Sequence, residues 1–271
     1  LYWKSDGQDQ KTFDLNIETP FIFKSPLGLK AQLNIFKQDS IYQNTKTAID
    51  LGYYFHYNKK IFLGYQSTES SDTQNTNTAS LTDYNNAFLT TEFEFSDFKA
   101  DDFLFPEKTF LDIKIGTGKR ETNTFSDQQL FGSLLFKHNF YLNKKNIIHL
   151  KTQNFYLQSN HYIINELERF GGINSIRGFN ENSLQGNLFS SLQNEYRYLL
   201  TPNLYVHSII DYGFIQDKTS DYQSNLLGAG FGFGLQTNNG LFNIVYANGS
   251  TGNQSAKLSN SVIHISFKAN F

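Results

Sequence analysis

The chain has 271 residues, a formal net charge of −2 and no cysteine. The near balance of charge gives no sign of a polyanionic partner such as nucleic acid, and the missing cysteines exclude disulfides, thiolate metal sites and a cysteine nucleophile. The longest apolar runs span about six residues, so none approaches the ~20 that a membrane-crossing helix needs. No signal peptide is visible and Leu1 already begins a predicted strand, so we expect a mature, processed or truncated product.

Apolar and polar residues alternate with a period of two along most of the chain. Odd positions from 13 to 23 are Phe, Leu, Ile, Thr, Phe and Phe, while Asp14, Asn16 and Glu18 lie between them. This is the period of a β-strand, whose successive side chains point to opposite faces. The pattern predicts a shortened strand in residues 1–6, followed in chain order by strands over residues 11–23, 26–41, 46–57, 60–70, 86–96, 107–118, 128–142, 145–158, 184–199, 203–216, 225–237, 240–250 and 259–271.

The predicted connections alternate between short turns and long polar loops. Many predicted strands exceed the ~5–6 residues usual in soluble sheets and match the ~9–11 tilted residues that cross a bilayer. Short turns are expected at Lys24–Pro26, Asn58–Lys59, Asn143–Lys145, Thr201–Asn203 and Asn238–Gly240, with a longer one over 97–106. Long loops are expected over 70–85, 119–127, 159–183, 217–224 and 250–258. This alternation is typical of outer-membrane β-barrels, which have short periplasmic turns and long external loops.

The alternative is a soluble β-sandwich or propeller, whose strands also alternate. A barrel is favoured because the outward positions are aromatic and nearly uncharged, whereas the inward ones carry charges, Asn, Gln and Gly. A soluble core would not accept those groups without partners. We therefore predict an all-β fold, a transmembrane antiparallel β-barrel with about 13–14 strands, in the bacterial outer membrane with the lipid bilayer as partner.

One loop carries a motif that narrows the family. Residues 170–179 read Phe-Gly-Gly-Ile-Asn-Ser-Ile-Arg-Gly-Phe, and acidic strand segments follow at 192–198 and 209–213. This ordered set resembles the outer-membrane insertase and two-partner-secretion superfamily, also described as bacterial surface antigen barrels. The resemblance implies a sixteen-stranded barrel whose long loop, here 159–183, folds inward five strands before the C-terminus. Against that pattern, residues 1–271 would form the barrel domain without its first strands, and no POTRA domain lies in this chain. A shortened barrel of about fourteen strands is the other interpretation.

The parity of the strands and the resemblance point to the same contact. Asp211 and Glu195 fall on the inward faces of their strands, and a buried arginine needs a carboxylate partner. We predict that Arg177 pairs with Asp211, with Glu195 nearby. An ordinary solvated pair, of which barrels hold many, is the alternative interpretation. Gly171, Gly172 and Gly178 would allow tight turns and close approach to the wall, and Phe179 would pack against it. Phe267 and Phe271 resemble a C-terminal assembly signal, although a lipid-facing strand with interfacial aromatics has the same pattern.

Motifs for chemistry are missing from the sequence. The six histidines show no metal-ligand spacing, and neither a Gly-x-Ser-x-Gly elbow nor a phosphate loop is present, so we expect no enzyme, metal or cofactor. The resemblance implies a barrel that inserts or translocates unfolded outer-membrane or secreted proteins, with periplasmic or lipoprotein subunits as further partners. A passive porin and an outer-membrane enzyme are the alternatives. Insertion of barrels and secretion of a partner protein cannot be separated on sequence.

Overall fold

The computed structural model describes the chain except residues 1, 6–9, 75–79, 253–256 and 270–271. Its regular structure is β-sheet apart from three 3-10 turns, η1 (Ile22–Lys24), η2 (Ile164–Glu166) and η3 (Leu258–Asn260). No helix among these residues is long and apolar enough to cross a membrane. The strands are β1 (Tyr2–Ser5), β2 (Gln10–Thr19), β3 (Leu27–Gln38), β4 (Tyr42–His56), β5 (Lys59–Asp72), β6 (Tyr84–Phe98), β7 (Glu107–Thr122), β8 (Ser126–Tyr141), β9 (Asn146–Gln158), β10 (Glu168–Phe170), β11 (Leu184–Gly186), β12 (Leu188–Thr201), β13 (Leu204–Asp217), β14 (Tyr222–Thr237), β15 (Gly240–Thr251) and β16 (Val262–Ala269).

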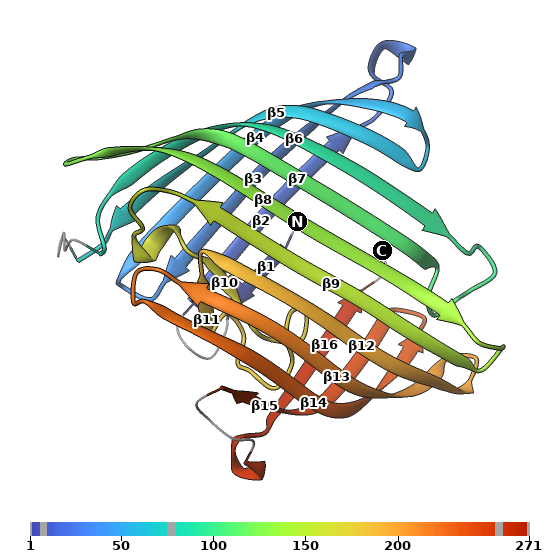
Figure 1. The fold of residues 1–271 in the computed structure, drawn as a ribbon. Coiled ribbons are helices and arrows are strands. Elements are labelled where there is room, and N and C mark those ends of the chain that lie inside the picture. Colours follow the sequence, from blue (N-terminus) through green and yellow to red (C-terminus); the bar gives the residue numbers. More distant parts are fainter. Residues whose placement is uncertain (1, 6–9, 75–79, 253–256, 270–271) are drawn as a thin grey trace. The chain divides into compact units, whose positions relative to one another are not determined.

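Fourteen of these strands form one sheet in chain order. The order runs from β1 to β9 and continues with β12 to β16, so that β1 and β16 are its end strands (Figure 1). The short strands β10 and β11 pair only with each other and lie within the long loop that separates β9 from β12. Five strands of the sheet therefore follow this loop, as predicted. The predicted all-β class and the predicted number of strands are confirmed.

The chain divides into two compact units. Unit 1 comprises Leu1–Phe95, Asp112–Ser133 and Tyr156–Leu167. Its strands expose apolar side chains on one face, as at Ile49 (66% exposed) and Leu63 (60%), and bury charged ones on the other, as at Asp50 (1%) and Glu92 (4%). This is the reverse of a soluble protein, in which the charged face is the exposed one. The exposed apolar face is suited to acyl chains.

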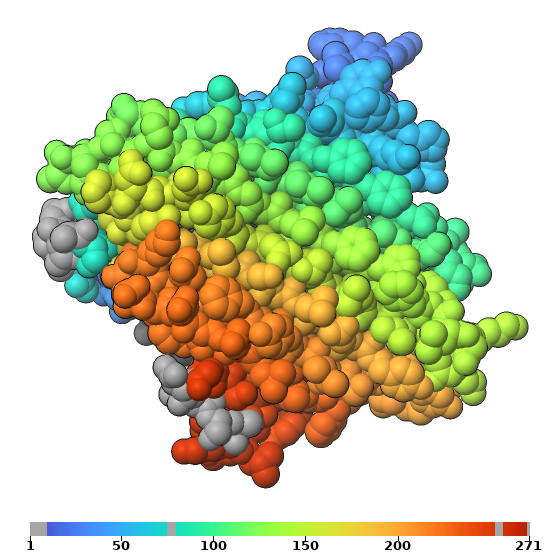
Figure 2. Space-filling model, viewed as in Figure 1, coloured from blue at the N-terminus to red at the C-terminus, as the bar shows by residue number. Residues whose placement is uncertain are grey.

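Unit 2 comprises Ser96–Leu111, Leu134–Phe155 and Glu168–Phe271. The strands β12 to β16 lie side by side in it, and the outward side chains of β12 and β13 (orange) form a continuous surface in Figure 2. On β13 the even positions, such as Ile210 and Tyr212, are exposed, whereas His207 and Asp211 are buried, which confirms the predicted parity. An apolar cluster on the buried side joins two loop residues to three strand residues: Phe170, Ile176, Phe189, Ile215 and Leu226.

Several strand boundaries were predicted wrongly, among them the long loop expected over 217–224, where β13 runs to Asp217 and β14 begins at Tyr222. The loop expected over 119–127 is a short turn, because β7 continues to Thr122 and β8 begins at Ser126. Here both faces of the strands carry polar residues, so the period of two is no longer visible in the sequence. Near the N-terminus, Phe21 and Phe23 do not continue β2, which ends at Thr19. Both have positive φ, in the turn around η1.

Candidate functional site

The tip of the long loop is a compact turn in unit 2. The backbone N–H of Gly172 donates to the carbonyl of Ile176 (3.2 Å), and that of Ser175 donates to the carbonyl of Gly172 (3.2 Å). Gly171 and Gly172 have φ values of 104° and 99°, a region that residues with a side chain rarely adopt. Ile176 is completely buried in the apolar cluster. The turn thereby presents the next residue, Arg177, to the sheet.

Arg177 lies against β13 and β12 and is 3% exposed. Its Nε donates to Oδ2 of Asp211 (2.8 Å), and its Nη2 donates to Oδ1 of the same carboxylate (2.5 Å). The backbone N–H of Arg177 also donates to Oδ2 of Asp211 (2.9 Å). Nη1 donates to Oε1 of Glu195 on β12. The structure thus brings the loop arginine and both predicted acids together, in the forked geometry that favours arginine over lysine.

Arg177 belongs to a cluster of four buried charged side chains. Glu195 accepts a second hydrogen bond, from Nε of Arg197 (2.7 Å), so two guanidinium groups face two carboxylates. Burial alone would lower the pKa of Arg177, but Glu195 and Asp211 raise it above its ordinary value. Arg197 also lies over the ring of Phe105, with 4.4 Å between Cζ and the ring centroid. A buried charge is tolerated only with such partners, and each of these four charged groups has an oppositely charged partner.

The backbone of the tip touches β14 and β15 at glycines. A side chain on Gly228 of β14 would collide with the carbonyl of Arg177, and one on Gly249 of β15 would collide with Gly178. These two glycines are direct partners across β14 and β15. Gly178, with a φ of 87°, donates its N–H to Nε2 of His264 on β16 (3.3 Å). Gly249 and His264 were not predicted from the sequence, since neither lies in a recognisable motif.

The remaining predicted residues are placed as follows. Phe179 is half-buried and packs against the apolar cluster of unit 2. Phe267 is 56% exposed on the outward face of β16. Phe271 lies outside the described residues. The assembly-signal role of these two phenylalanines stays a prediction.

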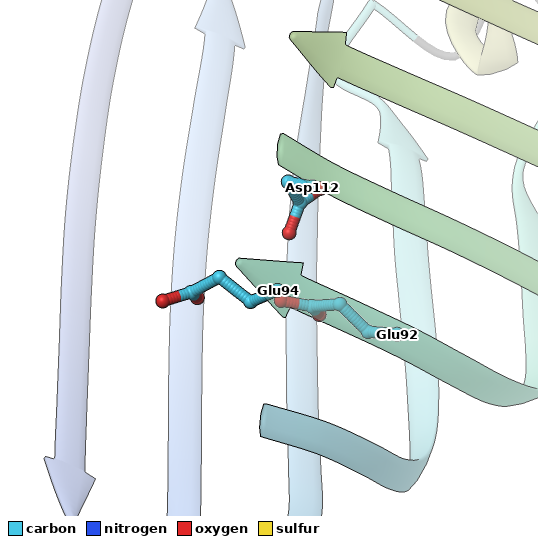
Figure 3. Close-up of side chains that lie close together, drawn as sticks. All are labelled: Glu92, Glu94 and Asp112. Atoms are coloured by element: carbon cyan, nitrogen blue, oxygen red, sulfur yellow. The ribbon is translucent and has the colours of Figure 1, made fainter. Parts of the chain in front are cut away.

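A separate group of carboxylates lies in unit 1. Glu92 and Glu94 on β6 and Asp112 on β7 offer oxygen atoms within 4.8 Å of one another (Figure 3). Lysines already bind this group, because Lys30 Nζ lies 2.5 Å from Glu92 Oε1 and Lys60 Nζ lies 2.7 Å from Glu94 Oε1. The ammonium groups supply the positive charge that a metal ion would bring. We therefore interpret the group as an ion-pair network on the buried face of the sheet.

The fold and the docked tip together define a class of protein. A meander of long antiparallel strands, apolar outside and charged inside, carries a loop whose arginine tip is bound to the inner face. Such strands are built for a bilayer, and such a loop distinguishes the class from a barrel with an open interior. The class is an outer-membrane protein with an inserted, charge-locked loop.

The comparisons with known proteins agree with this class. Residues 116–236 match the family model described as haemolysin secretion/activation protein ShlB/FhaC/HecB. The crystal structure of BamA from Haemophilus ducreyi lacking POTRA domains 1–3 is similar with a TM-score of 0.66 and 16% identity, over 95% of this chain and 61% of that one. CdiB from Acinetobacter baumannii gives a TM-score of 0.53 and 13% identity, over 96% of this chain and 57% of that one. No curated protein matches the chain significantly.

These matches establish the fold. The chain has an antiparallel β-barrel fold, as predicted, and the partial family match agrees with the resemblance that the loop motif carries. Its location in the bacterial outer membrane is likewise confirmed. The chain spans about three fifths of the length of the structures that it matches, at 61% and 57%.

Proposed function

We propose that this chain is the barrel of an outer-membrane protein that inserts or translocates other proteins without chemical catalysis. The observation that carries the proposal is the docked loop tip, in which Arg177 binds Asp211 and Glu195. A passive pore gains nothing from a buried, fully paired cluster, which costs desolvation to assemble. A barrel that must let a polypeptide pass benefits from a loop with two states, docked and released.

The family match favours secretion within this proposal. The matched residues 116–236 run from the end of β7 through nearly all of β14 and include the whole loop, and their family model is described as a haemolysin secretion/activation protein. We therefore take an unfolded, secreted polypeptide as the first substrate class and unfolded outer-membrane proteins as the second. Residues 1–271 would serve as one barrel domain, and periplasmic or lipoprotein subunits would be its accessory partners.

Deletion of the gene tests the proposal and separates its alternatives. The protein composition of the culture medium and of the outer membrane is measured with and without the complete gene product. Loss of one or a few proteins from the medium supports secretion, and a general loss of barrels from the outer membrane supports insertion. Unchanged protein composition together with reduced uptake of small solutes would identify a porin and refute the proposal.

Conductance of the purified protein in planar bilayers gives a second test. The docked tip lies on the inner face of the strands β12 to β16, so the wild type should conduct weakly. Arg177→Ala should increase the conductance by releasing the tip. A wild type that conducts as strongly as this variant would indicate that the tip does not restrict the interior.

A further inference from the structure

A second buried arginine, on β7 in unit 1, binds the first residues of the same loop. Arg120, near the end of β7, is 0% exposed. Its Nη1 donates to Oε1 of Glu166, and its Nη2 donates to Oδ2 of Asp127 on β8. Nη2 also donates to the carbonyl of His161 (3.1 Å). Glu166 and His161 belong to the first limb of the long loop, residues 161–167, which we call the base limb.

Further hydrogen bonds hold the Glu166 side chain in this position. Its carboxylate accepts hydrogen bonds from Nε2 of Gln129 on β8 (2.9 Å) and from the backbone N–H of Ile163 (3.1 Å). Burial raises the pKa of the Glu166 carboxyl, and Arg120 opposes this rise. The arginine therefore offsets the cost of placing a second carboxylate beside Asp127 in a site that is nearly dry.

The preceding residue of the base limb, Asn165, is bound on several sides. It is 0% exposed, and its Nδ2 donates to Oγ of Ser70 (2.7 Å) and to the carbonyl of Thr82 (2.9 Å). Its own carbonyl accepts from Nδ2 of Asn44 (2.6 Å) and from the hydroxyl of Tyr84 (3.3 Å). The base limb is thus fastened to strands β4 to β8 and to the residues that precede β6, all within unit 1.

The base limb and the tip of the loop are held by charged clusters in which the loop and the strands exchange roles. At the tip the loop supplies the arginine and the strands supply the acids, whereas at the base the strand supplies the arginine and the loop supplies an acid. We propose that Arg120 is a second positioning residue for the loop: it fixes the base limb, so that the tip can leave its site while the base limb stays bound. The consequence for transport rests on the proposed function, but the placement of the limb does not.

Thiol labelling of the purified full chain tests the proposal, because the sequence contains no cysteine of its own. Ile163 and Ile176 are both 0% exposed, so Ile163→Cys reports on the base limb and Ile176→Cys reports on the tip. In the Arg120→Gln background we expect maleimide labelling at position 163 to accelerate on the order of tenfold or more, since two buried acids lose their shared cation. The labelling rate at position 176 should stay within about twofold of its value in the parent, because Arg120 and the tip cluster share no partner residues.

Three further variants make the result specific. Lys30→Gln removes a buried cation of unit 1 that binds Glu92 and not the loop, and it should leave labelling at position 163 unchanged. Adding Glu166→Gln to Arg120→Gln should slow the labelling at position 163 again, since it removes one of the two buried carboxylates left without a cation. Arg120→Lys keeps the charge without the fork and should give an intermediate rate, which preserves the test if Arg120→Gln does not fold.

Two results would overturn the proposal. One is labelling at position 163 that does not change in the Arg120 variants. The other is an equal acceleration by Lys30→Gln, which would show general loosening of the sheet. Failure of the transport hypothesis would instead appear in the protein composition of the medium and outer membrane, with these labelling rates unaffected.

Discussion

Removing the guanidinium of Arg177 should release the loop tip. Arg177→Ala eliminates three side-chain hydrogen bonds and leaves Asp211, which is 0% exposed, with the backbone N–H of residue 177 as its remaining contact to the tip. Glu195 keeps its bond to Arg197. Breaking one partner out of a buried pair typically costs about 3–5 kcal/mol. At about 1.4 kcal/mol per factor of ten, the docking equilibrium should shift by about a hundredfold or more.

The rate of maleimide labelling at Ile176→Cys measures this shift. Asp211→Asn should have a smaller effect, about thirtyfold, because a hydrogen bond to a charged group contributes about 1.5–3 kcal/mol and the amide oxygen still accepts one bond. Asp50→Asn is the matched control, since Asp50 is similarly buried (1% exposed) and accepts a hydrogen bond from the hydroxyl of Thr90 on β6 instead of from the loop. Circular dichroism should show an intact sheet in all three variants. Labelling of Arg177→Ala within about twofold of the parent would refute the reasoning.

Three other predictions concern the packing of the tip, the base limb and the last strand. Gly228→Val should expel the tip and accelerate labelling at position 176, because the added side chain meets the carbonyl of Arg177, whereas Gly132→Ala, which meets nothing within 4 Å, should have no effect. In Arg120→Gln, lowering the pH from 7 to 5 should slow labelling at position 163, measured relative to an exposed Asn123→Cys reference. Burial raises the pKa of Glu166, so the bound limb takes up a proton first and acid favours the bound state. Phe267→Ala should reduce the amount of barrel assembled in the outer membrane without lowering its denaturation temperature, since this side chain is 56% exposed and packs little.

The strands that cross the apolar layer could be predicted from sequence because their two faces meet different solvents. On β13 this difference alone assigns Asp211 to the buried face and Ile210 to the exposed one. The register then places Gly228 directly beside Asp211, where the loop backbone needs space. The tip cluster was thus accessible to reasoning from parity together with the loop motif.

The base limb was not predictable in the same way. Arg120 lies near the end of β7, and the neighbouring Lys119 and Glu121 are exposed and charged. With polar residues on both faces, the period of two no longer shows which side chain points inward. Asn165 and Glu166 lie in the single 3-10 turn η2 of the long loop, where contacts depend on long-range packing and leave no periodic signal.

The most direct measurement of the central claim is the amount of client protein delivered by a strain that carries Asp211→Asn in the complete gene product. If tip docking serves protein transport, the proteins lost on gene deletion should also be lost or strongly reduced here, at wild-type levels of assembled barrel. The Asp50→Asn strain should deliver them normally. Normal delivery by the Asp211→Asn strain, with the tip shown by labelling to be released, would contradict the account.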